Sequence, residues 1–167
     1  IWFPEGKSAT RAPEGTRYFR AAVALPAETP FTCAHFIVNA DDSCTPFVNG
    51  VQLRKKGSGW TDFETYDVTR LLRAGRNVLA VEVRNGLPGP AGLIGWLVIR
   101  TGKEKRVLAV TDGAWKTADK LKPGWEHPKH DDSAWPSAQE LGPVSMAPWS
   151  GRLRYSRVPM LSLDNAF

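Results

Sequence analysis

The sequence HFIVNADDSCTPFVNG, residues 35–50, contains two strand-like runs in succession. An alternating apolar run ends at two adjacent carboxylates, Asp41 and Asp42, and a second run ends at Asn49-Gly50. A period of two is typical of β-strands, and Asn-Gly forms tight turns because both residues tolerate positive φ. The stretch therefore predicts two strands joined as a hairpin, with the aspartates in the turn between them.

Similar runs recur along most of the chain, each bounded by Gly, Pro, Asn or Asp. They occupy residues 16–25, 34–40, 45–50, 76–85, 92–100 and 106–112. The nearest helical candidate is a single turn within residues 68–75, with Thr69 as its N-cap and Gly75 as its end. Many short strands at this spacing predict an all-β protein, either a sandwich or a jelly roll.

The apolar side chains of these strands are expected to fill a core between two sheets. The expected core residues are Tyr18, Phe19, Phe36, Val38, Phe47, Val48, Val78, Leu79, Val81, Val83, Leu97 and Ile99.

Residues 116–151 have a different composition, rich in Pro, Trp, Asp and Ser. The tryptophans in and beside this segment would expose a large apolar area unless they packed on the strands. We therefore expect a long Trp/Pro-rich wrap over the sandwich, and one domain spanning residues 1–167. Within the wrap, DDSAW (residues 131–135) predicts a capped turn in which Asp131 or Asp132 accepts hydrogen bonds from the following backbone N–H groups.

Composition and charge argue against several classes of protein. The net charge is +5, but the basic residues are dispersed, with short clusters at residues 54–56 and 102–106 and no basic helix. Nucleic acid is therefore not predicted as a partner. No run approaches the roughly 20 apolar residues of a membrane-spanning helix. In the predicted hairpin Cys33 and Cys44 are not cross-strand neighbours, so two thiols rather than a disulfide are expected.

The sequence contains no pattern specific to catalysis. His35, His127 and His130 lack metal-binding spacing with the cysteines, and no G-x-S-x-G motif is present. The acidic residues do not form a pattern specific to glycoside hydrolysis. The residues therefore predict no enzymatic activity in this chain.

Six stretches, in order along the chain, together resemble one family. They are WFPEG…GTRYFR (2–20), VNADD…FVNG (38–50), YDVTRLLRAGRNVLAVEVRN (66–85), PAGLIGWLVI (90–99), VTDGAWKTA (110–118) and DDSAWPSAQELG…APW (131–149). They resemble the galactose-binding-like β-sandwich modules found beside the catalytic domain of bacterial α-L-rhamnosidases and in related secreted proteins. The resemblance implies a jelly roll, an extracellular or periplasmic parent protein, and carbohydrate and neighbouring domains of the parent chain as partners.

The resemblance also implies a calcium site. Sugar-binding members hold calcium in loops at one end of the sandwich, through an acidic pair, an Asn side chain and a carbonyl from a Pro-containing loop. Here Asp41 and Asp42 match the acidic pair, and NGLPGPAG (85–92) offers the Asn85 side chain and the Pro90 carbonyl. These oxygen donors suit calcium, with water and sugar hydroxyls completing its shell. The alternative is that Asp41, Asp42 and Asn85 are turn residues whose side chains bind nearby backbone groups.

A sugar site also needs a flat ring on which a pyranose can stack. Trp60, in the loop KKGSGWTDFE (55–64), is the candidate, and the alternative is that Trp60 holds this loop in place. The expected carbohydrate-binding residues are thus Asp41, Asp42, Trp60 and Asn85. The predicted function is calcium-assisted binding of L-rhamnose or another sugar with vicinal hydroxyls; the alternative is a structural or interaction module without a sugar site.

Overall fold

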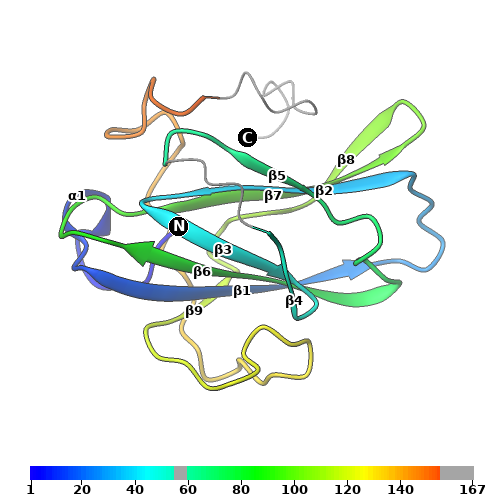
Figure 1. Cartoon of the computed structure of the whole chain (residues 1–167), viewed down its shortest axis with the longest axis horizontal. Helices are drawn as coiled ribbons and strands as arrows, with labels where there is room; N and C mark the ends of the chain where they lie inside the picture. Colours follow the sequence, from blue (N-terminus) through cyan, green and yellow to red (C-terminus); the bar gives the residue numbers. More distant parts are fainter. Residues whose placement is uncertain (55–59, 155–167) are drawn as a thin grey trace.

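The protein is a β-sandwich of two antiparallel sheets (Figure 1). The computed structural model describes residues 1–54 and 60–154. The order of strands is β4-β3-β6-β1-β9 in the five-stranded sheet and β5-β2-β7-β8 in the four-stranded sheet. The all-β prediction is therefore confirmed.

The five-stranded sheet is built around two long central strands that pair along their whole length. Its strands are β1 (Gly15–Leu25), β3 (Ser43–Val48), β4 (Val51–Gln52), β6 (Gly75–Asn85) and β9 (Lys116–Ala118). The strands of the other sheet are β2 (Cys33–Ala40), β5 (Glu64–Asp67), β7 (Leu93–Thr101) and β8 (Glu104–Val110). Within the described ranges, no helix has the length and apolar character needed to cross a membrane.

A short helix, α1 (Ser8–Arg11), lies before β1 and was not predicted. The single turn predicted within residues 68–75 is present, since Leu71 N and Leu72 N both donate to Val68 O, and Gly75 begins β6. The side chain that caps this turn is Asp67, which accepts from Thr69 N at 2.9 Å. An Asp just before a turn competes well for backbone N–H groups, so it takes the role that we assigned to Thr69.

The predicted hairpin across Asp41 and Asp42 is also wrong. β2 pairs with β5 and β7, and β3 pairs with β4 and β6, so the chain crosses from one sheet to the other at the two aspartates. Asp41 N donates to Gly92 O at 3.1 Å, and Asp42 N donates to Arg84 O at 2.9 Å. The acidic pair therefore forms a corner that is bonded to both sheets.

The turn at Asn49-Gly50 is confirmed. It joins β3 to β4, with φ values of 52° and 86°. The expected absence of a disulfide is confirmed as well, because Cys33 in β2 and Cys44 in β3 lie in different sheets and are not bonded to each other.

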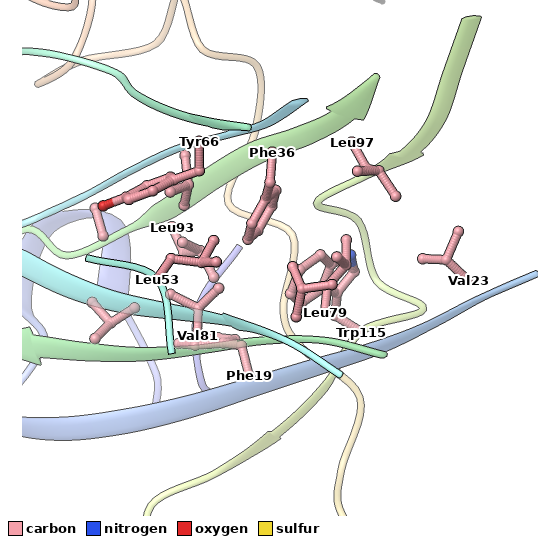
Figure 2. Close-up of a cluster of buried hydrophobic side chains, with 14 of the residues drawn as sticks. Phe19, Val23, Phe36, Leu53, Tyr66, Leu79, Val81, Leu93, Leu97 and Trp115 are labelled. Atoms are coloured by element: carbon pink, nitrogen blue, oxygen red, sulfur yellow. The ribbon is translucent and has the colours of Figure 1, made fainter. Parts of the chain in front are cut away.

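The core lies between the sheets, where Phe19 and Val81 of the five-stranded sheet face Phe36 and Leu97 of the other (Figure 2). Most of the expected core residues lie here, but three lie on the outer face of the five-stranded sheet: Tyr18, Phe47 and Val78. Each of the three is next in sequence to a core residue. Because side chains alternate between the two faces of a strand, both members of such a pair cannot point inward.

The C-terminal wrap covers the outer faces of both sheets (Figure 1). On the five-stranded sheet, Trp125 packs edge-on against Tyr18 and Phe47, with ring centroids 5.2 and 5.6 Å away. On the four-stranded sheet, Leu153 and Trp149 pack with other apolar residues of the wrap and the sheet. The tryptophans are thus covered, as predicted.

Candidate carbohydrate and calcium site

The residues of the expected site gather at one end of the sandwich. The Asp41-Asp42 corner, the loop of residues 86–92 and α1 all lie at the left-hand end in Figure 1. The corner and the loop are joined directly, because Gly86 N donates to Asp42 Oδ2 at 2.8 Å. The fold thus brings the acidic pair next to the loop that follows Asn85 and contains Pro90.

Asp41 is half-buried beside the carboxyl group of Asp42. Burial raises the pKa of Asp41 to about 7, and hydrogen bonding to Asp42 and its negative charge add to the effect. The neutral form of Asp41 is favoured because a second negative charge beside Asp42 would be repelled. A cation between them would relieve the same repulsion.

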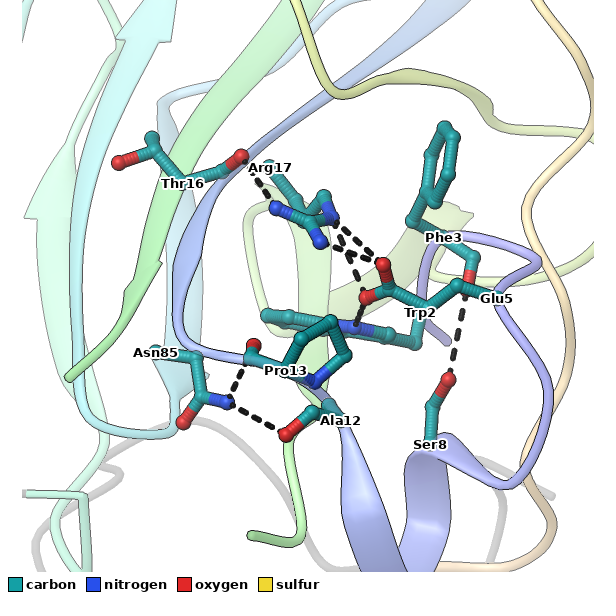
Figure 3. Close-up of polar contacts among 9 residues, drawn as sticks. All are labelled: Trp2, Phe3, Glu5, Ser8, Ala12, Pro13, Thr16, Arg17 and Asn85. Atoms are coloured by element: carbon teal, nitrogen blue, oxygen red, sulfur yellow. Dashed lines mark hydrogen bonds and ion pairs between the residues drawn. The ribbon is translucent and has the colours of Figure 1, made fainter. Parts of the chain in front are cut away.

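Asn85 ends β6 and is almost fully buried, with 2% of its surface exposed. Its amide nitrogen donates to the carbonyls of Ala12 and Pro13 at 3.3 and 2.9 Å (Figure 3). The amide orientation is therefore set by two acceptors, and the side-chain oxygen points away from them (Figure 3). A neutral oxygen donor is held in a fixed direction at this end of the sandwich.

The N-terminal segment that presents these two carbonyls is itself anchored. Glu5 accepts hydrogen bonds from the guanidinium of Arg17 and, at 2.8 Å, from the indole nitrogen of Trp2 (Figure 3). Trp2 is fully buried and packs on Phe19, with the ring centroids 5.6 Å apart. This network explains why residues far from the acidic pair in sequence help to shape the same end.

The Pro90 loop is held by hydrogen bonds on both sides of the proline. Gly89 and Ala12 exchange two backbone hydrogen bonds of 2.6 and 3.0 Å, and Ala91 N donates to Ser8 O at 3.0 Å. Pro90 lies between these two anchored residues, so the path of its main chain is restrained.

Trp60 is half-buried and lies in a loop that is attached to the end of β2. Asn39, two residues before Asp41, donates to the carbonyls of Trp60 and Asp62, both at 2.8 Å. The guanidinium carbon of Arg152 lies 6.0 Å from the centroid of the Trp60 ring. Through Asn39, the Trp60 loop is connected to the strand that leads into the acidic pair.

Asn39 was missed by the sequence reasoning, although it organises the Trp60 loop. It is buried, and both of its hydrogen bonds described above reach across to a separate loop. The available signal was a polar residue inside the apolar run HFIVNA. A buried amide in such a run needs partners, which points to a contact outside its own sheet.

The donor types at this end agree with the preferences of calcium. In the parts of the chain that the structure describes, no three His, Cys, Asp or Glu side chains gather as a metal site. The expected calcium site does not require three, because two carboxylates, one amide oxygen and one carbonyl supply hard oxygen ligands. The facing carboxyl groups of Asp41 and Asp42 fit this donor set.

Comparison with known proteins finds similarity to a segment of a much larger enzyme. The chain is 37% identical over 156 residues to an α-L-rhamnosidase of Streptomyces avermitilis; this match covers 89% of the chain and 15% of the rhamnosidase. No family model matches the chain. The chain thus spans only a small part of the length of this curated relative.

Solved structures show the same relationship. The crystal structure of Streptomyces avermitilis α-L-rhamnosidase complexed with L-rhamnose matches with a TM-score of 0.83 and 34% identity, over 92% of this chain and 15% of that one. A lectin from Pleurotus ostreatus in complex with GalNAc matches with a TM-score of 0.80 and 28% identity, over 92% of this chain and 45% of the lectin. The chain is thus homologous to a segment of an α-L-rhamnosidase, and the expected resemblance is confirmed.

Proposed function

We propose that this chain is a non-catalytic carbohydrate-binding module of a larger glycan-active protein. The observation that carries the proposal is the pair of facing carboxyl groups, Asp41 and Asp42, at an end of the sandwich that also holds Asn85 in a fixed orientation. Similarity to a rhamnosidase segment and to a lectin supports carbohydrate as the ligand class.

The finer proposal is that calcium assists binding. Asp41, Asp42 and Asn85 would hold the ion by side-chain oxygens, and Pro90 by its carbonyl. Bound calcium supplies a cation whose coordination shell accepts two vicinal hydroxyl oxygens of a sugar. A bound cation would favour the ionised form of Asp41, and the hydrogen bond from Gly86 N to Asp42 orients that carboxylate.

L-rhamnose is the first sugar to test, because the more similar of the two solved structures was complexed with L-rhamnose. Trp60 would offer its ring to the apolar face of the sugar. A weak site of this kind acts by tethering, since it raises the local concentration of the attached domains on a polysaccharide. We place the parent protein outside the cytoplasmic membrane, in the extracellular space or the periplasm.

A second candidate is a structural or interaction module with no sugar site. It is favoured by the contacts of Asp42 and Asn85 with backbone groups, which are the contacts expected of turn residues. It does not account for the raised pKa of Asp41, because hydrogen bonds from backbone N–H groups would lower the pKa of a turn aspartate.

Calorimetric titration distinguishes the two candidates. L-rhamnose, with galactose and GalNAc for comparison, is titrated into the chain in millimolar calcium and again in excess chelator. We expect calcium-dependent binding that is lost in Asp41→Ala and retained in Asp119→Ala, an exposed acid in the wrap. If none of the three sugars produces heat under either condition, the rhamnose and calcium proposals are wrong and the structural module takes their place.

A further inference from the structure

A cavity lies on the outer face of the four-stranded sheet, beneath the C-terminal wrap. Its volume is about 430 Å³, which is within the range of small-molecule sites. Residues of the acidic corner and Trp60 are not among those that line it. We infer that this cavity is a second binding site, for a small aromatic ring that carries hydroxyl groups on one edge.

The walls of the cavity are mostly apolar. The sheet contributes Ile94, Trp96 and Val110, and the wrap contributes Val144, Trp149 and Leu153. Trp96 is fixed in the floor by its packing against Phe63, with ring centroids 5.1 Å apart. The Trp149 ring closes against the backbone of Gly92, so closely that a Cβ at residue 92 would lie 3.0 Å from it. Rigid apolar surfaces on opposite sides favour a flat apolar ligand.

The polar groups of the cavity include two carboxylates, Asp112 and Glu140. Glu140 Oε1 accepts a hydrogen bond from Gly113 N at 2.8 Å, and Asp112 Oδ1 accepts one from Ala114 N at 2.9 Å. These bonds orient each carboxylate through one of its two oxygens. The other oxygen of each is an acceptor, so a matching ligand donates hydrogen bonds at this edge.

Apolar walls with two carboxylates at one edge favour a hydroxylated aromatic ring over a pyranose or an alkyl chain. A pyranose carries hydroxyl groups around its whole edge and would leave several of them against apolar walls without partners. An alkyl chain would offer no donor to Asp112 or Glu140. An aromatic ring with hydroxyl groups on one side places its apolar body between the walls and its donors at the carboxylates.

The test uses the full chain, labelled with ¹⁵N, and resorcinol as the probe. Toluene is the matched probe without donors, and benzylamine is the matched cation. We expect resorcinol to shift the signals of the Trp149 indole N–H and the Gly113 amide, and to bind about tenfold more tightly than toluene, as a hydrogen bond to a charged acceptor allows. Tighter binding of benzylamine than of resorcinol would overturn the assignment of a hydroxylated ligand.

Two variants check the location. Val144→Trp fills the cavity from the wrap and should abolish the shifts, while an unchanged melting temperature shows that the fold is intact. Glu140→Gln keeps an acceptor for Gly113 N but removes the charge, so it should weaken resorcinol about tenfold and leave toluene unchanged. Shifts that persist in Val144→Trp, or no shifts in the original chain, would overturn the inference.

The inference does not rest on the proposed sugar site, although Asn39, which holds the Trp60 loop, also lines the cavity. Asp41→Ala should leave resorcinol binding unchanged, because Asp41 does not line the cavity. If L-rhamnose binds and resorcinol does not, only the inference of a second site is wrong. If resorcinol binds and L-rhamnose does not, only the proposed function is contradicted.

Discussion

The chain contains two Asp-Asp pairs, and the fold treats them differently. Asp131 accepts a hydrogen bond from Ser133 N at 3.0 Å, and Asp132 forms an ion pair with Arg20 at 2.8 Å. Asp41, in contrast, lies half-buried against the carboxyl group of Asp42. A carboxylate that already has donors around it supports the fold. The facing carboxyl groups of Asp41 and Asp42 are the feature on which the proposed calcium site rests.

The pKa values follow the same division. Hydrogen bonds from the backbone and side chain of Ser133 lower the pKa of Asp131, whereas burial and Asp42 raise the pKa of Asp41 to about 7. The same dipeptide therefore has opposite preferences for a proton at its two positions. Each pair can be tested by substituting one of its two aspartates.

The largest effect on the free energy of unfolding is expected at the pair Asp131 and Asp132. Arg20 is fully buried, and its guanidinium also donates to the carbonyls of Trp125 and His127. Asp132→Ala leaves this charge without its anion, so we expect the free energy of unfolding to fall by about 3 kcal/mol in urea titrations. Asp131→Ala is the matched control and should have a much smaller effect. Equal losses in the two variants would contradict the division between them.

Calcium should stabilise the folded chain by binding to Asp41 and Asp42. If the ion binds only the folded state, calcium at about tenfold above its dissociation constant raises the free energy of unfolding by about 1.4 kcal/mol. Thermal unfolding with and without chelator measures this gain. Asp41→Ala should remove it and Asp131→Ala should retain it, whereas a gain that survives in Asp41→Ala would locate the ion elsewhere.

The strands were predictable because alternation is a local property, but their partners were not. The runs on either side of Asp41 and Asp42 fit a hairpin as well as a corner between sheets, since either arrangement buries one face of each strand. The same limitation applies to Tyr18 and Phe19, which are both apolar, so the sequence does not tell which of them points into the core. Tyr18 points to the outer face, where it packs against Trp125. The wrap itself was predictable, because so many tryptophans require cover.

The candidate site residues came from a resemblance, and their geometry depends on contacts that are distant in sequence. The orientation of Asn85 is set by Ala12 and Pro13, more than 70 residues away. Those carbonyls are in place because α1 and the Glu5 network hold the N-terminal segment. A four-residue helix has no amphipathic period to detect, so this support could not be anticipated from the sequence.

The smallest effect expected is the pH dependence of the acidic corner without calcium. Because the pKa of Asp41 is about 7 in the folded chain and near 3.8 when unfolded, the folded state keeps a proton that the unfolded state has released between these values. The folded state binds more protons, so the free energy of unfolding falls as pH rises from about 4 to about 7. Since Asp41 is half exposed, we expect this fall to be about 1 kcal/mol. Asp131 contributes with the opposite sign, because its pKa is lowered on folding and its stabilisation is lost as pH falls.

Urea unfolding at pH 5 and pH 8 in excess chelator measures this pH dependence of the free energy of unfolding. Asp41→Asn, which resembles the protonated form of Asp41, should remove the contribution of the acidic corner. An unchanged slope in Asp41→Asn would mean that the pKa of Asp41 is not raised on folding, and the contrast between the two acidic pairs would then rest on the Arg20 ion pair alone.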